Sequence, residues 1–190
     1  MVFCFASGTF NMRQCADRIH IAKDFWFTYN KSMTLAKKIT QILTEKNQTL
    51  SLAESCTGGL LAHWLTNIPG SSKFLKAGIV AYANETKEKF LRVPRATLEK
   101  HGAVSLPTIK HMAQGARSLF KTDFSIAISG IAGPSGSSKE KPLGLTFIAV
   151  ATKKKIHAAR FIFKGSRLSV KKQAATKALE LLKNLLDETR

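Results

Sequence analysis

Apolar positions along the chain alternate between two spacings, which predict strands and helices in turn. Short apolar runs predict strands at 49–54, 77–83, 124–129, 144–152 and 156–163. Apolar residues that recur every three or four positions predict helices at 58–67, 85–91, 95–100, 106–120 and 168–187. Strands that alternate with helices indicate an α/β fold, a three-layer α/β/α sandwich. The last two strands form a hairpin around Lys153–Lys155, so we expect a mixed sheet.

The first 32 residues differ from the rest of the chain. They mix aromatic and polar residues without a sustained period, and Met33 then opens a clean amphipathic helix. We therefore divide the chain into an N-terminal extension, 1–32, and one domain, 33–190. Our hypothesis is that translation begins at Met33, which would make 1–32 an upstream misannotation or a weakly ordered extension.

Composition narrows the class of protein. The net charge of +18, from 30 Lys+Arg against 12 Asp+Glu, favours anionic partners such as nucleotides or nucleic acid. The run Lys153–Lys155 has a plainer explanation, a solvated hairpin tip. Three scattered cysteines suit neither a disulfide framework nor a zinc site, and free thiols suggest a cytoplasmic protein. No apolar run approaches the ~20 residues that span a bilayer, so we expect no membrane partner.

The segment Ala53–Gly59, AESCTGG, lies where a predicted strand turns into a helix. The first amides of a helix lack intrahelical partners, and the helix dipole adds positive potential. Such a turn can hold an anion, or the oxyanion that forms when an amide carbonyl is attacked. The alternative is structural: Thr57 caps the helix, and the glycines allow a tight turn.

Three further polar segments follow strand ends or open helices. They are Tyr82–Lys87, Ser129–Pro134 and Gly165–Arg167 with Lys171. In open α/β sheets, ligands bind beyond the carboxyl ends of the strands. Each segment alone is a weak signal, because glycines shape ordinary loops and an exposed arginine is usually just solvated.

Taken together and in order, these motifs resemble a known family. The stretch AESCTGGLLAHWLTNIPGSSKFLKAGIVAYANETK, followed by HGAVS, SGIAGPSG, KPLG and FKGSR, is similar to the C-terminal domain family of the competence/damage-inducible protein CinA. The resemblance covers about Thr34 to Leu186. It implies an α/β/α sandwich around a five-stranded mixed sheet, and a stand-alone, PncC-like form without the large N-terminal domain of the two-domain members.

The resemblance also implies an activity. Stand-alone members are nicotinamide-nucleotide amidohydrolases (NMN deamidases), which hydrolyse the carboxamide of nicotinamide mononucleotide to nicotinate mononucleotide and ammonia. It implies no cofactor and no metal, and the five histidines are too scattered for a metal pair. We expect a small-molecule nucleotide substrate and a homo-oligomer, most simply a dimer.

Amide hydrolysis needs a nucleophile, a base and an oxyanion site. We expect Ser55 as nucleophile, Lys87 as base with a lowered pKa, and Tyr82 to position or relay the proton. The remaining candidates bind substrate, with amides of the turn for the oxyanion and cations for the phosphate. These substrate-binding candidates are Thr57, Gly58, Asn84, Ser129, Gly130, Arg167 and Lys171.

Three positions depart from the family pattern. Ser129 stands where Thr is more frequent, Ser166 where Asp is, and Lys171 where Arg is. The change at Lys171 keeps the charge but loses the bidentate fork, so phosphate affinity or substrate range could shift.

Two neighbours of Ser55 leave alternatives open. Cys56 is a rival nucleophile beside a helix N-terminus. Adjacent residues at a strand end point to opposite faces, however, which favours packing for Cys56. Glu54 is either a residue that orients the site or a charge at the helix N-terminus, and we favour the second.

The competing function is a non-catalytic nucleotide or nucleic-acid binding protein linked to competence or DNA damage. The net charge of +18 supports this alternative. We favour the amidohydrolase over it.

Overall fold

The computed structural model describes residues 12–188 of the 190-residue chain, with side chains from Tyr29 onward. Five strands and the helices around them follow the order expected from the sequence. The elements are α1 (Met12–Glu45), β1 (Leu50–Glu54), α2 (Leu60–Thr66), a 3₁₀ turn η1 (Ser71–Lys73), β2 (Leu75–Val80), α3 (Asn84–Leu91), α4 (Arg95–His101), α5 (Leu106–Phe120), β3 (Phe124–Gly130), β4 (Leu145–Ala151), β5 (Ile156–Ile162) and α6 (Arg167–Glu188).

The sheet has the order β2-β1-β3-β4-β5. Strands β2, β1 and β3 run parallel, whereas β3, β4 and β5 pair antiparallel. The parallel pairs need the crossover helices that the sequence places between them, while β4 and β5 need only a tight turn. The predicted mixed sheet of five strands is therefore confirmed.

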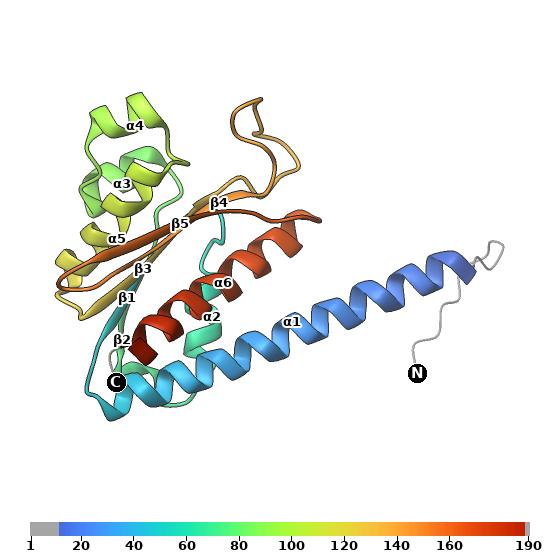
Figure 1. Ribbon diagram of the computed structural model, residues 1–190, viewed down its shortest axis with the longest axis horizontal. Coiled ribbons are helices and arrows are strands. Elements are labelled where there is room, and N and C mark those ends of the chain that lie inside the picture. The colour runs from blue at the N-terminus through green and yellow to red at the C-terminus, as the bar shows by residue number, and fades with distance from the viewer. Residues whose placement is uncertain (1–11, 189–190) are drawn as a thin grey trace.

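Helices cover both faces of the sheet, which confirms the three-layer sandwich (Figure 1). On one face, α1, α2 and α6 bury a large aliphatic cluster against β1, β3 and β4. On the other face, α5 packs with α3 and α4 over a second cluster. Alternation along β1 divides its residues between the layers, because Leu50 and Leu52 join the first cluster and Ala53 joins the second.

The first helix starts earlier than the sequence pattern indicated. Helix α1 begins at Met12 and continues without a break through Met33, the expected helix start, to Glu45 (Figure 1). Its join to the domain is anchored near Met33, where Lys31 pairs with Glu180 and the Ser32 hydroxyl bonds that of Thr176. Residues 1–11 of the expected extension lie outside the described residues, and the translation start remains a prediction.

Within residues 12–188, no helix combines the length and apolar character that a bilayer-spanning segment needs.

Candidate active site

The candidate site lies at the carboxyl end of β1, where consecutive side chains turn to opposite faces of the sheet. Glu54 belongs to the face covered by α2, and Cys56 packs in the cluster on that face. Ser55 therefore projects, like Ala53, toward the layer of α3 and α5. The backbone keeps this register beyond the strand, because the Ser55 amide donates to the Ile128 carbonyl at 2.9 Å.

Glu54 occupies the start of α2. Its buried carboxylate accepts hydrogen bonds from the amides of Gly59 and Leu61, each at 3.1 Å, and of Ala62 at 2.9 Å. A carboxylate is well placed there, because these amides lack intrahelical partners and the helix dipole is positive at that end. The role of Glu54 as the helix N-terminal charge is confirmed. The first turn of α2 is consequently filled by the protein itself.

The turn between β1 and α2 leaves fewer donors than the sequence suggested. The Gly58 amide closes the turn on the Ser55 carbonyl at 3.1 Å, so this predicted oxyanion donor is already engaged. The Thr57 amide has no hydrogen-bond acceptor among the described residues, and the fully buried Thr57 hydroxyl has no partner among them either. A buried polar group without a partner is costly and uncommon, so Thr57 is the stronger candidate to meet a ligand.

Lys87 is buried from solvent at the start of α3, with only 1 % of its surface exposed. Its Nζ donates to three backbone carbonyls, those of Ala81 at 2.8 Å, Tyr82 at 2.9 Å and Ala83 at 3.4 Å. Burial lowers the pKa of Lys87, and the opposing effects of Cys56 and Glu85 are smaller. The lowered pKa has the direction expected from the sequence.

The strand register sets Lys87 beside Ser55. Glu54 pairs with Val80 in the parallel β1–β2 ladder, and the Ala81 amide donates to the Glu54 carbonyl at 2.7 Å. Ser55 and Ala81 are therefore neighbours across the two strand ends, and the Ala81 carbonyl is the shortest contact of Lys87 Nζ. Ser55 and Lys87 share the α3 side of the sheet, although their side chains are not hydrogen-bonded to each other in this structure.

Arg167, the first residue of α6, joins two loops above the strand ends. One Nη donates to the Gly133 carbonyl at 2.7 Å, and the other donates to the Tyr82 hydroxyl at 3.0 Å. Tyr82 is otherwise 61 % exposed. The sequence predicted neither the contact with Gly133 nor that with Tyr82, because no local pattern relates residues 34 and 85 positions apart.

Lys171 lies against the β1–α2 turn. Its Nζ is 3.6 Å from the place where a Cβ at Gly58 would stand, and Gly58 has φ +63°. Neither Arg167 nor Lys171 forms an ion pair with a described acidic side chain. Both cations act on Cys56 electrostatically, which places them near the turn. Two cations without carboxylate partners can therefore meet an anion beside Ser55.

The three other substrate-binding candidates differ in their surroundings: the protein itself engages Ser129 and Gly130, whereas Asn84 has no side-chain partner among the described residues. The Ser129 hydroxyl is buried and donates to the Ala103 carbonyl at 2.8 Å, which ties β3 to the segment before α5. Gly130 is required by packing, since a Cβ there would lie 2.6 Å from the Thr146 hydroxyl oxygen. Asn84 is exposed at the start of α3, and its side chain has no hydrogen bond among the described residues. Within that same part of the chain, no cluster of three His, Cys, Asp or Glu side chains could hold a metal ion.

Comparison with known proteins places this geometry in a family. The model of the CinA C-terminal domain matches residues 32–186. The chain belongs to the CinA C-terminal domain family. It is 43% identical over 167 residues to a CinA-like protein of Endomicrobium trichonymphae, a match that covers 88% of this chain and 39% of that protein. The chain thus spans about two fifths of the length of the curated relatives it matches.

This chain matches the two solved structures named below over most of their length. The competence/damage inducible protein CihA from Agrobacterium tumefaciens has 38% identity and a TM-score of 0.80, with 82% of this chain and 95% of that chain covered. A CinA superfamily protein from Enterobacter cloacae has 29% identity and a TM-score of 0.79, with 98% of each chain covered. The CinA domain alone therefore exists as a folded unit among the relatives.

We predict that Glu54→Gln lowers the free energy of unfolding by about 1–3 kcal/mol. An amide retains one acceptor oxygen and turns N–H groups toward the helix amides, which leaves buried donors unpaired. Urea unfolding followed by circular dichroism measures the change. Glu99→Gln is the control, because its exposed pair with Arg95 is expected to be worth less than about 1 kcal/mol. Equal stability of Glu54→Gln and wild type would contradict the capping role.

We predict that Cys56 resists alkylation in the folded protein. Burial raises the pKa of its thiol to about 11, so the reactive thiolate is scarce near pH 8. Mass spectrometry of the Cys56 peptide after iodoacetamide treatment is expected to find label only when urea is present. Labelling of the native protein at the rate of an exposed cysteine would restore Cys56 as a nucleophile.

Proposed function

We propose that the protein hydrolyses the carboxamide of nicotinamide mononucleotide to nicotinate mononucleotide and ammonia, without a metal. The supporting observation is the buried Lys87 with a lowered pKa beside the end of β1, on the face to which Ser55 projects. A serine hydroxyl needs such a base, since it is weakly nucleophilic by itself. The chain belongs to the CinA C-terminal domain family. The resemblance of its motifs to the stand-alone members, which implies amidohydrolase activity, supports the choice of substrate.

The hydrogen bonds of Lys87 suit a neutral amine as well as an ammonium. A neutral amine has two N–H donors, which match the short contacts with the carbonyls of Ala81 and Tyr82. The third contact, with Ala83, is the longest at 3.4 Å and is the one the neutral form gives up. In the proposed reaction, the lone pair of this neutral amine accepts the proton of the Ser55 hydroxyl.

In the proposed reaction, Ser55 Oγ attacks the carboxamide carbon while its proton passes to Lys87 Nζ. The tetrahedral oxyanion is held by the Thr57 amide. The C–N bond then breaks, and Lys87 returns the proton to the departing ammonia. Water attacks the resulting ester, again giving a proton to Lys87, and the acyl–oxygen bond breaks as Ser55 regains its proton. The balance is carboxamide and water in, carboxylic acid and ammonia out.

The substrate phosphate has cationic partners on the other side of the turn. Arg167 uses two of its five N–H donors on Tyr82 and Gly133, which leaves the others for phosphate oxygens. Lys171 adds a second charge close to Gly58, where the absence of a side chain keeps the approach open. Tyr82 is positioned by Arg167, so we assign it an orienting part in the same site.

We also expect a homodimer, which light scattering of the purified protein would test.

We predict that Ser55→Ala lowers ammonia release from nicotinamide mononucleotide by at least about 1,000-fold. Removal of the hydroxyl removes the nucleophile, while the backbone register is unaffected. Cys56→Ala is the matched control on the next residue, and it is expected to retain activity within about threefold. A coupled assay for ammonia measures both. Release that survives Ser55→Ala, or that is lost with Cys56→Ala instead, would move the nucleophile away from Ser55.

We predict that kcat/KM rises with pH on an ascending limb whose midpoint lies below 10.5, the ordinary lysine value. The pKa of Lys87 is lowered, so the active neutral amine is lost as pH falls through that lowered pKa and is present above it. Lys87→Arg keeps a cation but cannot deprotonate, and should lose the limb together with the activity. An ascending limb that persists in an active Lys87→Arg variant would exclude Lys87 as the base.

A further inference from the structure

The proposed hydrolase site does not use most of the positive charge of the protein. Lys153, Lys154 and Lys155, singled out in the sequence, lie at the tip of the β4–β5 hairpin. This tip is at the end of the sheet remote from Ser55, because β4 begins beside the carboxyl end of β3 and runs back to Ala151, which pairs with Ser125 at the start of β3. The charge therefore calls for a separate explanation.

The hairpin tip is a defined structure. The Thr152 hydroxyl accepts hydrogen bonds from the amides of Lys154 at 3.3 Å and Lys155 at 3.0 Å, and donates to the Lys155 carbonyl at 3.1 Å. The Thr152 amide closes the turn on the same carbonyl at 2.8 Å. All three lysine side chains are exposed. The backbone thus presents three adjacent ammonium groups on a turn fixed by its own hydrogen bonds.

More cations lie near this tip, on the side of the sheet that α5 covers. Arg160 is exposed on β5 and pairs in register with Phe147, whose side chain belongs to the α5 side of the sheet. Lys110 is exposed on α5, and Lys121 follows the end of that helix. The pairing of Ser125 with Ala151 brings the α5–β3 connection next to the hairpin tip. We call this surface the α5–β5 face, defined by Lys110, Lys121, Lys153, Lys154, Lys155 and Arg160.

The α5–β5 face carries more positive than negative charge. Neither α5 nor the segment from β4 to the end of β5 contains an aspartate or glutamate. Asp123, in the α5–β3 connection, keeps its negative charge and accepts hydrogen bonds from the amide and hydroxyl of Thr49, each at 2.8 Å. None of the six cations forms an ion pair with a described residue. Because the cations outnumber the carboxylates along these segments, the face suits a polyanion better than a single phosphate.

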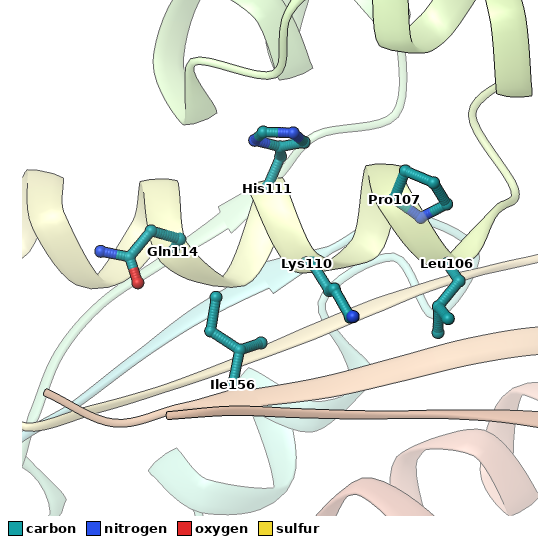
Figure 2. Close-up of a pocket in the computed structure, with 6 residues that line it drawn as sticks. All are labelled: Leu106, Pro107, Lys110, His111, Gln114 and Ile156. Atoms are coloured by element: carbon teal, nitrogen blue, oxygen red, sulfur yellow. The ribbon is translucent and has the colours of Figure 1, made fainter. Parts of the chain in front are cut away.

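A groove runs through the same face. It has a volume of about 450 Å³ and is lined by Leu106, Pro107, Lys110, His111, Gln114 and Ile156. Figure 2 shows Leu106 and Lys110 reaching from α5 toward the strand that carries Ile156. The apolar parts of Leu106, Pro107 and Ile156 suit the flat faces of unpaired bases, and Gln114 can hydrogen-bond their edges. A duplex buries those base faces in its own stack, so it cannot use this groove.

We propose that the α5–β5 face binds single-stranded nucleic acid, with phosphates on the lysines of the hairpin tip and bases in the groove. The length of β5 suits a ligand of several nucleotides, since the six steps between its seven residues span about 20 Å at about 3.3 Å each. This binding is independent of amide hydrolysis, because none of the face's residues belongs to the proposed active site.

Fluorescence anisotropy with a labelled 20-nucleotide oligothymidylate, titrated at several salt concentrations, tests the proposal. The triple variant K153Q/K154Q/K155Q is expected to bind at least about tenfold more weakly. The slope of the logarithm of the binding constant against the logarithm of the salt concentration should be smaller in magnitude by about 2. This change corresponds to three lost lysine–phosphate contacts at about 0.7 each. The matched control is K37Q/K38Q/K46Q, which removes the same charge from two exposed positions on α1 and one just after its end, and should change affinity less than threefold.

Three results would overturn the proposal. Equal weakening in both triple variants would mean that only net charge matters. A 20-base-pair duplex that binds as tightly as the single strand would exclude the groove. Absence of binding by the folded wild type at 100 mM salt would exclude the face altogether. Because the K153Q/K154Q/K155Q variant should release ammonia at the wild-type rate, failure of this proposal and failure of the hydrolase proposal are separately visible.

Discussion

The alternation of side chains at the end of β1 is the constraint on which the candidate site depends. It sends Glu54 to the face of α2 and Ser55 to the face of α3. The Glu54 carboxylate then fixes the first turn of α2 by taking three of its amides. With α2 anchored in this way, the Ser55–Gly58 turn is held in one position, and Cys56 packs in the core cluster on the α2 face.

The second half of the site depends on backbone carbonyls. Lys87 is retained in a buried position because the carbonyls of Ala81, Tyr82 and Ala83 satisfy its donors while burial lowers its pKa. Arg167 connects this segment to Gly133 through the Tyr82 hydroxyl. The side chain of Arg167 therefore joins three connections of the sheet, those after β2, β3 and β5. The basic α5–β5 face lies apart from this network.

Much of this architecture could be predicted from the sequence. The apolar spacing of α5 predicted its bounds, Leu106–Phe120, and the short apolar runs predicted five strands in a mixed sheet. The order of the motifs predicted that Ser55, Lys87 and Arg167 belong to one site. The opposite orientations of Ser55 and Cys56 followed from the period of a strand. The catalytic assignments of Ser55, Lys87 and Tyr82 remain predictions.

Other features of the fold could not be predicted, because no local sequence pattern indicates them. The segment before Met33 carries aromatic residues without a period, so its continuation of α1 could not be read from the pattern. Strand β2 was expected to reach Ala83 but ends at Val80, because the carbonyls of the next residues turn toward Lys87. The hydrogen bond from Ser129 to Ala103 uses a hydroxyl that the sequence assigned to substrate. Backbone acceptors are the same in every residue, so only the folded chain reveals which ones meet a side chain.

In the proposed reaction, Ser55 forms a covalent bond to the substrate acyl group. Acid quenching during turnover of nicotinamide mononucleotide, followed by mass spectrometry of the digested protein, tests this step. We expect an ester on the peptide that carries Ser55, present in Cys56→Ala and absent from Ser55→Ala. An adduct that persists in Ser55→Ala and disappears in Cys56→Ala would exclude Ser55 as the nucleophile.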